Sequence, residues 1–100
     1  MVSIVTQIRL KEGSQQEWDT AMRERMAAAA KHPGWIGGQL LQGDTAGDRR
    51  IIVGTWKSRA DWQAWHQDPK FTKTRAALEG LVAEPEQHTW CRVIVDARGK

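Results

Sequence analysis

Residues 2–10 alternate between apolar and polar side chains, and this stretch constrains the fold more than any other. One side of the run carries Val2, Ile4, Thr6, Ile8 and Leu10. The other side carries Ser3, Gln7 and Arg9. A period of two is typical of a β-strand with one buried face. The run is therefore predicted to be a strand, with Thr6 as the one hydroxyl in its apolar row.

A helix is predicted to follow over residues 14–31. Ser14 is a suitable N-cap, and Glu17 three positions later would complete a capping box. Apolar side chains then recur at helical spacing, namely Trp18, Met22, Met26 and Ala29. Pro33 cannot continue a helix and Gly34 relaxes the backbone, so the helix should end just before them.

The second half of the chain predicts a hairpin, two short helical pieces and a last strand. Strands are expected at 35–42 and 49–56, joined by the turn-rich "GDTAGD". Ser58 can cap a short helix that runs to about Trp65, and Asp68 can cap a second piece with Pro69 in its first position. The apolar stripe of that second piece is Phe71, Leu78 and Val82. Residues 88–97 are predicted to form the last strand.

The element order β-α-β-β-α-β predicts one ferredoxin-like α+β domain over residues 1–100. In this arrangement a four-stranded antiparallel sheet has its helices on one face. Apolar strand residues also point to the opposite face: Val5, Leu41, Val53 and Val93. A second copy of the chain is the simplest cover for them, so we expect a homodimer whose sheets close on each other.

The totals fit a globular protein and exclude several classes. The chain has 15 basic and 12 acidic residues, a net charge of +3, and the signs alternate along it. Cys91 is the only cysteine, so neither an internal disulfide nor a cysteine-based metal site is possible. No signal peptide and no membrane-length apolar run is present, which makes a cytoplasmic protein the expectation.

Aromatic residues gather in the stretch "ADWQAWHQDPKF". At about 100° per residue, Trp62, Trp65 and His66 lie within one arc of a helix. On the next helical piece, Thr74 and Arg75 interrupt or border the apolar stripe. Inward polar groups need partners or water, because burying them unpaired costs a few kcal/mol.

A cavity between the helices and the sheet would satisfy these groups. We expect it to be lined by Thr6, Trp65, Phe71, Thr74 and Arg75. A mostly apolar pocket with a few converging polar groups is typical of a small-molecule site. The alternative is that Trp62 and Trp65 belong to the core and Arg75 extends into solvent.

The segments "PGWIGGQLLQG", "GTWKSRADWQAW" and "DPKFTKTR" resemble, in order and spacing, the antibiotic biosynthesis monooxygenase domain family of dimeric α+β barrels. The likeness extends from Val2 to about Ala97. It implies the fold given above, as a homodimer with a pocket between helices and sheet. Members of the family oxidise aromatic polyketides without flavin, metal or haem, and others degrade haem.

The haem-degrading branch implies an Asn on the first strand, a helix Trp and a His nine or ten residues after it. These positions fall on Thr6, on Trp65, and on Thr74 or Arg75. Only the Trp matches, and neither Thr nor Arg normally ligates haem iron. Haem binding, with His66 as a substitute ligand, therefore stays the less favoured reading.

The cofactor-free branch implies a monooxygenase that binds a small aromatic molecule, takes up a proton and stabilises an oxyanion. Trp62, Trp65 and Phe71 could stack on the rings, Arg75 could hold the oxyanion, and His66 could act as base. Trp65, Arg75 and His66 are thus the candidate catalytic residues, and Thr6, Trp62, Phe71 and Thr74 the candidate substrate-binding residues.

Two rivals are binding modules. Ferredoxin-like domains that bind RNA expose aromatic rings on the third strand, where this chain has Ile51, Ile52 and Val53. RNA is therefore not an expected partner. A non-catalytic dimer that binds a small aromatic ligand remains open, because a fold does not determine a function.

Overall fold

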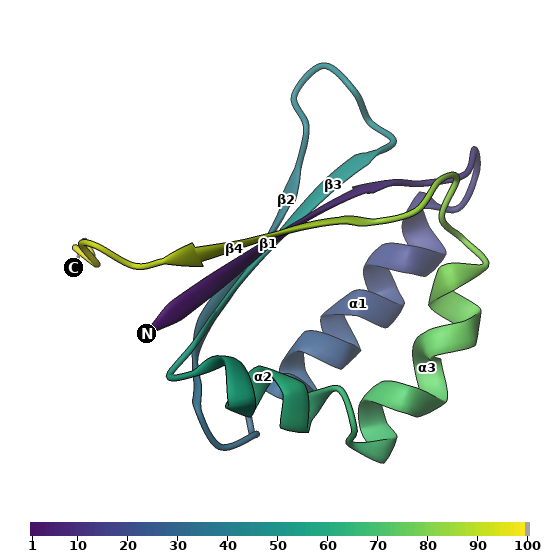
Figure 1. Cartoon of the computed structure of the whole chain (residues 1–100). Coiled ribbons are helices and arrows are strands. Elements are labelled where there is room, and N and C mark those ends of the chain that lie inside the picture. The colour runs from purple at the N-terminus through teal and green to yellow at the C-terminus, as the bar shows by residue number, and fades with distance from the viewer. Residues whose placement is uncertain (100) are drawn as a thin grey trace.

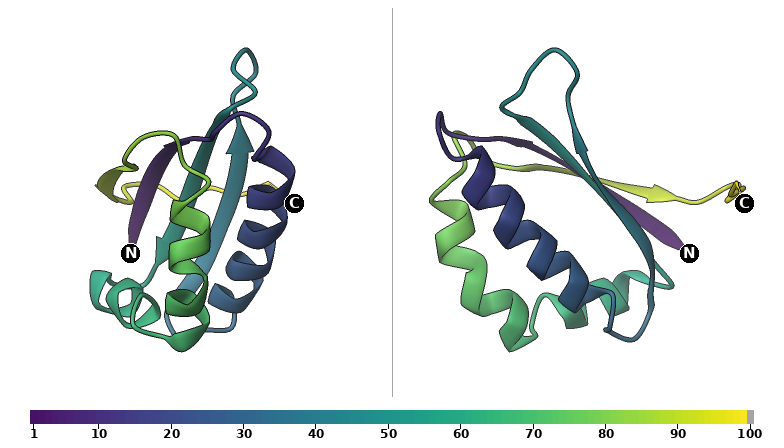
Figure 2. Two further views of the ribbon diagram at one scale, coloured as in Figure 1. Left: turned by 90° about the vertical axis from the view of Figure 1, so that its right-hand side faces the viewer. Right: turned by 180° about the vertical axis from the view of Figure 1, so that it is seen from behind.

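The computed structural model describes residues 1–99 and shows an α+β fold in two layers (Figure 1). The strands are β1 (Val2–Arg9), β2 (Trp35–Gln42), β3 (Arg49–Trp56) and β4 (Gln87–Arg92), and the helices are α1 (Gln15–Ala29), α2 (Arg59–Trp65) and α3 (Pro69–Glu79). The sheet is antiparallel with the order β2-β3-β1-β4. All three helices lie on one face of it, as Figures 1 and 2 show. The predicted ferredoxin-like fold is confirmed.

The predicted alternation of buried and exposed side chains along β1 is confirmed. Ile4, Thr6 and Ile8 are buried under the helices, and Gln7 and Arg9 are exposed. β1 is a central strand, so each of its residues has two neighbours across the ladder. Thr6 lies opposite Ile52 of β3 and opposite His88 of β4. The register therefore places three side chains in a row on the covered face.

The helix starts agree with the predicted caps at two of three places. The Ser58 hydroxyl accepts from the Asp61 N–H at 3.2 Å, and the Asp68 carboxylate accepts from the Lys70 N–H at 2.8 Å. The capping box at Ser14 is wrong, because this residue makes no side-chain cap bond. Its N–H donates to Lys11 O in a tight turn, and its near-helical φ of −95° and ψ of −4° differ from the extended backbone that an N-cap needs.

The core under the helices has two parts. The first is closed by aliphatic contacts around one indole and consists of Ile8, Leu10, Trp18, Met22 and Leu78. The second consists of Ala29, Trp56 and Trp65, with Trp35, Trp62 and Phe71 packed against it. Among residues 1–99 no helix is long and apolar enough to cross a membrane.

β4 is shorter than predicted. It ends at Arg92, whereas the sequence suggested a strand over 88–97. The reason is the partner strand: Val2, the first residue of β1, pairs with Arg92, and the last backbone bond between the two segments runs from Val93 N–H to Met1 O at 3.4 Å. The tail therefore leaves Ile94 and Val95 in solvent, 84% and 78% exposed.

The opposite face of the sheet carries no helix. Val5 and Val53 lie across from each other and are half-buried, and Leu41 is 40% exposed. Ser3 and Thr55 share a hydroxyl–hydroxyl hydrogen bond of 2.6 Å on the same face. This surface is apolar at its centre and polar at its side, and its predicted cover is a second copy of the chain.

Candidate functional site

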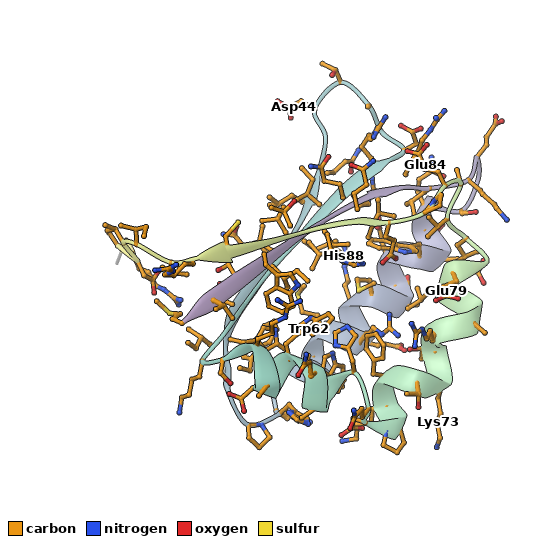
Figure 3. All side chains as sticks on the ribbon, viewed as in Figure 1. Asp44, Trp62, Lys73, Glu79, Glu84 and His88 are labelled. Atoms are coloured by element: carbon orange, nitrogen blue, oxygen red, sulfur yellow. The ribbon has the colours of Figure 1, made fainter. Side chains whose placement is uncertain are left out.

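A hollow of about 110 Å³ lies between the sheet and the three helices. All seven elements contribute to its lining. Its aromatic wall consists of Trp35, Trp56, Trp62, Trp65 and Phe71. Its polar groups are Thr6, Arg25, His66, Glu86 and His88. Figure 3 shows Trp62 on α2 and His88 on β4 in the space between the two layers.

The break between α2 and α3 builds one side of the wall. Trp62 and Trp65 lie on α2, and Phe71 lies in the first turn of α3, which Asp68 and Pro69 begin anew. The Trp65 and Phe71 rings meet edge-on with centroids 5.8 Å apart. A continuous helix would carry Phe71 further along its axis, so the capped restart brings this ring back onto Trp65.

His66 is part of the same wall. Its imidazole lies between two rings, with centroids 3.6 Å from Trp62 and 4.0 Å from Phe71. Its Nδ1 is 2.9 Å from the Trp62 carbonyl oxygen, which can only accept, so Nδ1 carries the proton. Burial lowers the pKa of His66 to about 4, although this hydrogen bond partly raises it again. At neutral pH the ring is therefore uncharged.

Trp35 forms the far side of the wall through a bend in its own strand. Its ring packs edge-on against Trp56 at 5.2 Å, next to the register shift at the start of β2. A Cβ at Gly38 would lie only 2.6 Å from the Cη2 atom of Trp35. The missing side chain at Gly38 thus leaves room for this indole.

Arg25 of α1 is the cation of the hollow. Its guanidinium lies 3.6 Å above the centroid of Phe71, and Nη2 donates to Phe71 O at 2.8 Å. Its Nε is buried and has no hydrogen-bond partner within residues 1–99. Burial lowers the pKa of Arg25 to about 10, which leaves it charged at neutral pH. A partly buried guanidinium beside flat rings is suited to an anionic oxygen on an aromatic ligand.

A second polar group lies across the hollow from the helices. Thr6 Oγ1 and His88 Nδ1 are 3.0 Å apart, and His88 Nε2 is 3.6 Å from a Glu86 carboxylate oxygen. Thr6 is only 7% exposed, whereas the His88 side chain is 44% exposed. This row joins the inside of the hollow to the surface.

The predicted site residues divide into two groups. Thr6, Trp62, Trp65, His66 and Phe71 all line the hollow. Arg75 and Thr74 do not. The Arg75 side chain is 62% exposed and pairs with Glu79 one turn on at 3.2 Å, while the Thr74 hydroxyl donates to Phe71 O at 3.0 Å. The sequence suggested that Arg75 binds an oxyanion in the hollow. In the structure its side chain points away from the hollow and cannot do so in this conformation.

The sequence analysis did not predict that Arg25, Glu86 and His88 line the hollow. A signal for Arg25 was present: seven positions after Trp18, it falls about 20° from that residue on the helix, at the edge of the apolar stripe. A charge that borders a buried stripe marks a functional candidate. No comparable local signal marks Glu86, which lies in the loop before β4.

The residues do not fit a haem iron. Thr74 and Arg75, at the axial-ligand position of the haem-degrading pattern, lie outside the hollow. His66, the substitute ligand, is enclosed between two rings. Within residues 1–99 no group of three or more His, Cys, Asp and Glu side chains is placed to hold a metal ion.

Comparisons with known proteins point the same way as the fold. The family model described as antibiotic biosynthesis monooxygenase matches residues 1–77. No curated protein gives a significant sequence match.

Solved structures share the fold at low sequence identity. A protein from Nitrosomonas europaea is 18% identical, with 95% of this chain and 100% of that one covered and a TM-score of 0.89. A mutant of SnoaB, a cofactor-independent oxygenase from Streptomyces nogalater, is 18% identical, with 95% and 94% covered and a TM-score of 0.84. Rv0793 from Mycobacterium tuberculosis is 13% identical, with 97% and 98% covered and a TM-score of 0.87.

Proposed function

The chain belongs to the antibiotic biosynthesis monooxygenase family, and from this premise we propose that it is a cofactor-independent monooxygenase of a small hydroxylated aromatic molecule. The observation that carries the proposal is Arg25, a partly buried cation 3.6 Å above the Phe71 ring of the aromatic wall. SnoaB, whose fold is similar, is a cofactor-independent oxygenase.

The substrate class follows from the chemistry that needs no cofactor. A naphthol or anthrone that has lost its acidic proton can itself reduce dioxygen. One oxygen atom enters the ring carbon as a quinone carbonyl, and the other leaves as water with the two hydrogens lost from the substrate. The protein has to bind the ring, accept a proton and stabilise the oxyanion.

The lining residues supply two of these tasks directly. Trp62, Trp65 and Phe71 offer flat faces and edges to an aromatic ring. Arg25 lines the same space, and its guanidinium would hold the oxyanion. The enclosed part of the hollow is smaller than the roughly 150 Å³ that accommodates benzene. One ring edge would therefore enter, and the rest of the substrate would extend toward the opening beside His88.

His66 was the candidate base from sequence. Its geometry favours a different role, because a ring clamped between Trp62 and Phe71 with a lowered pKa accepts a proton poorly at neutral pH. We propose that His66 is a neutral part of the ring-binding wall.

The test is oxygen uptake with 1-naphthol and with an anthrone, using enzyme treated with chelator and free of flavin. Under ¹⁸O₂ one labelled atom should appear in the quinone product. Trp65→Phe and Arg25→Met should each lower turnover. Binding of 1-naphthol, followed by tryptophan fluorescence, without any oxygen uptake would favour the non-catalytic binding protein. A Soret shift on adding haem would favour the haem branch.

We also propose that two copies of the chain pair through the uncovered sheet face. The half-buried Val5 and Val53 and the exposed Leu41 support this pairing. Sedimentation should give twice the mass of one chain, and Val53→Glu should give the single chain. A wild-type monomer at micromolar concentration would contradict the pairing.

A further inference from the structure

Thr6, His88 and Glu86 form a row that crosses the wall of the hollow. The register of β1 against β4 fixes the first two, because Thr6 and His88 are direct partners across the ladder. Their side chains meet at 3.0 Å through Oγ1 and Nδ1. The carboxylate of Glu86 lies 3.6 Å from the other ring nitrogen, Nε2.

The two ends of this row face different surroundings. Thr6 is buried and faces the hollow. His88 and Glu86 line the hollow and also a second, outer depression, which they share with Arg75 and Glu79 of α3. His88 is therefore the side chain through which a proton can pass from the buried space to solvent.

The tautomer of His88 follows from its neighbours. The Glu86 carboxylate 3.6 Å away favours a proton on Nε2, and Nδ1 is then left as an acceptor. The Thr6 hydroxyl then donates to Nδ1. Both lone pairs of Thr6 Oγ1 remain for a hydrogen-bond donor in the hollow.

We propose that Thr6, His88 and Glu86 are a proton relay that removes the hydroxyl proton of the bound aromatic substrate, a proposal that rests on the function given above. The substrate O–H bond breaks as its proton bonds to Thr6 Oγ1, and the hydroxyl proton of Thr6 passes to His88 Nδ1. The electron pair stays on the substrate oxygen, which faces Arg25.

The charges around the relay balance after the transfer. The imidazolium of His88 lies beside the carboxylate of Glu86, and it returns its proton to water from its exposed side. The other charged groups around it are Arg75 and Glu79 on α3 and Glu84 in the loop before β4. Arg25 on α1 feels the charge of Glu86, which opposes the lowering of its pKa. His66 is a poorer acceptor, since burial lowers its pKa to about 4.

The first experiment measures kcat and KM for 1-naphthol oxidation in Thr6→Val, His88→Gln and His88→Ala. We expect kcat to fall about 100-fold with KM nearly unchanged. Free imidazole should restore part of the turnover of His88→Ala, which a purely structural role would not allow. Thr72→Val on the outer side of α3 is the matched control and should behave as wild type.

The second experiment needs no oxygen chemistry. 4-Nitrophenol is coloured only as the phenolate and consists of one ring. At a pH about one unit below its pKa, the bound form should be largely phenolate in the wild type and largely neutral in His88→Gln and Thr6→Val.

The two experiments separate the two proposals. Turnover by the wild type with an unaffected His88→Gln variant in both assays would overturn the relay and leave the oxygenase. No oxygen uptake by the wild type, with 4-nitrophenol ionisation that depends on His88, would overturn the oxygenase and support the relay as a proton-transfer device.

Discussion

Two arginines mark the two halves of the space under the helices, and they differ in how completely they are paired. Arg50 of β3 is 4% exposed and lies beside the first turns of α1. Its guanidinium donates to both oxygens of Asp19 and to the carbonyls of Gly47 and Arg49 at 2.8–3.0 Å. The hydrogen bond to Asp19 raises the pKa of Arg50.

Arg25, near the other end of α1, has one such bond, to Phe71 O, and a buried Nε without a partner. Its pKa is lowered by the burial that its partners do not offset. The same residue type therefore serves two purposes. Complete pairing joins β3 to α1 where the core is closed, and the less completely paired Arg25 lies where the core is hollow.

The largest effect is expected where the pairing is complete. Asp19→Ala would leave the Arg50 charge buried without its counter-ion, and the free energy of unfolding should fall by about 3–5 kcal/mol. Urea unfolding measures this loss. Asp19→Asn is the matched control and should lose less, because one acceptor remains. A loss below about 1 kcal/mol would contradict the difference drawn between the two arginines.

The complementary change at Arg25 should act on function. Arg25→Met keeps the length of the side chain and removes a desolvated charge, so the free energy of unfolding should change by no more than about 1 kcal/mol. Turnover should fall about 10²–10³-fold, as expected for the loss of an oxyanion donor. Arg25→Lys tests whether the planar guanidinium is needed, since lysine keeps the charge without planar stacking on Phe71. Unchanged turnover in Arg25→Met would remove Arg25 from the site.

The hollow end should also be the acid-sensitive one. The unfolded chain binds a proton at His66 near its ordinary pKa of 6.5, while the folded chain binds it only at about 4. As pH falls from 6.5 toward 4, the unfolded state takes up the proton first, and the free energy of unfolding should decrease. After allowance for the partial exposure of the ring, the decrease should be about 1–2 kcal/mol.

Urea unfolding at pH values near 7 and about 4.5 measures this dependence. His66→Phe keeps an aromatic ring between Trp62 and Phe71 and cannot titrate. The acid-dependent loss in this variant should therefore be smaller than in the wild type. An equal loss in both proteins would show that other groups cause it.

The smallest effect is expected at Arg75. This side chain is exposed and makes one ion pair, with Glu79 at 3.2 Å on the same helix. Arg75→Ala should lower the free energy of unfolding by no more than about 0.5 kcal/mol and leave turnover within about two-fold of wild type. A large loss of turnover would return Arg75 to the role that the sequence suggested.

The fold could be predicted because its signals are local. The hairpin strands follow from β-rich runs on either side of a turn, and the caps at Ser58 and Asp68 need only residues two or three positions away. The errors arose where distant partners decide. The end of β4 depends on where β1 begins, and Ser14 takes part in a turn with Lys11. The residues of β4 and of the helix start do not by themselves reveal either feature.

The part of the candidate site on α2 and the start of α3 could be predicted from the sequence, whereas the part on other elements could not. Trp62, Trp65 and Phe71 are marked by spacing along the chain. Which arginine lines the hollow depends on how α1 packs against α3. The hydrogen bond from Arg25 to Phe71 O shows this contact, and it joins residues 46 positions apart in the chain. Periodicity on α3 could show that Arg75 borders the stripe, but not that the neighbouring helix already supplies a guanidinium.

Gly38 gives the hollow an adjustable size. The Trp35 indole occupies the place where a side chain at this position would begin, and Val53 O lies 3.0 Å from the same point. Alanine there would force this ring, which lines the hollow, to move. A single methyl on an outer strand could therefore change which molecules are admitted, without touching any group that does the chemistry.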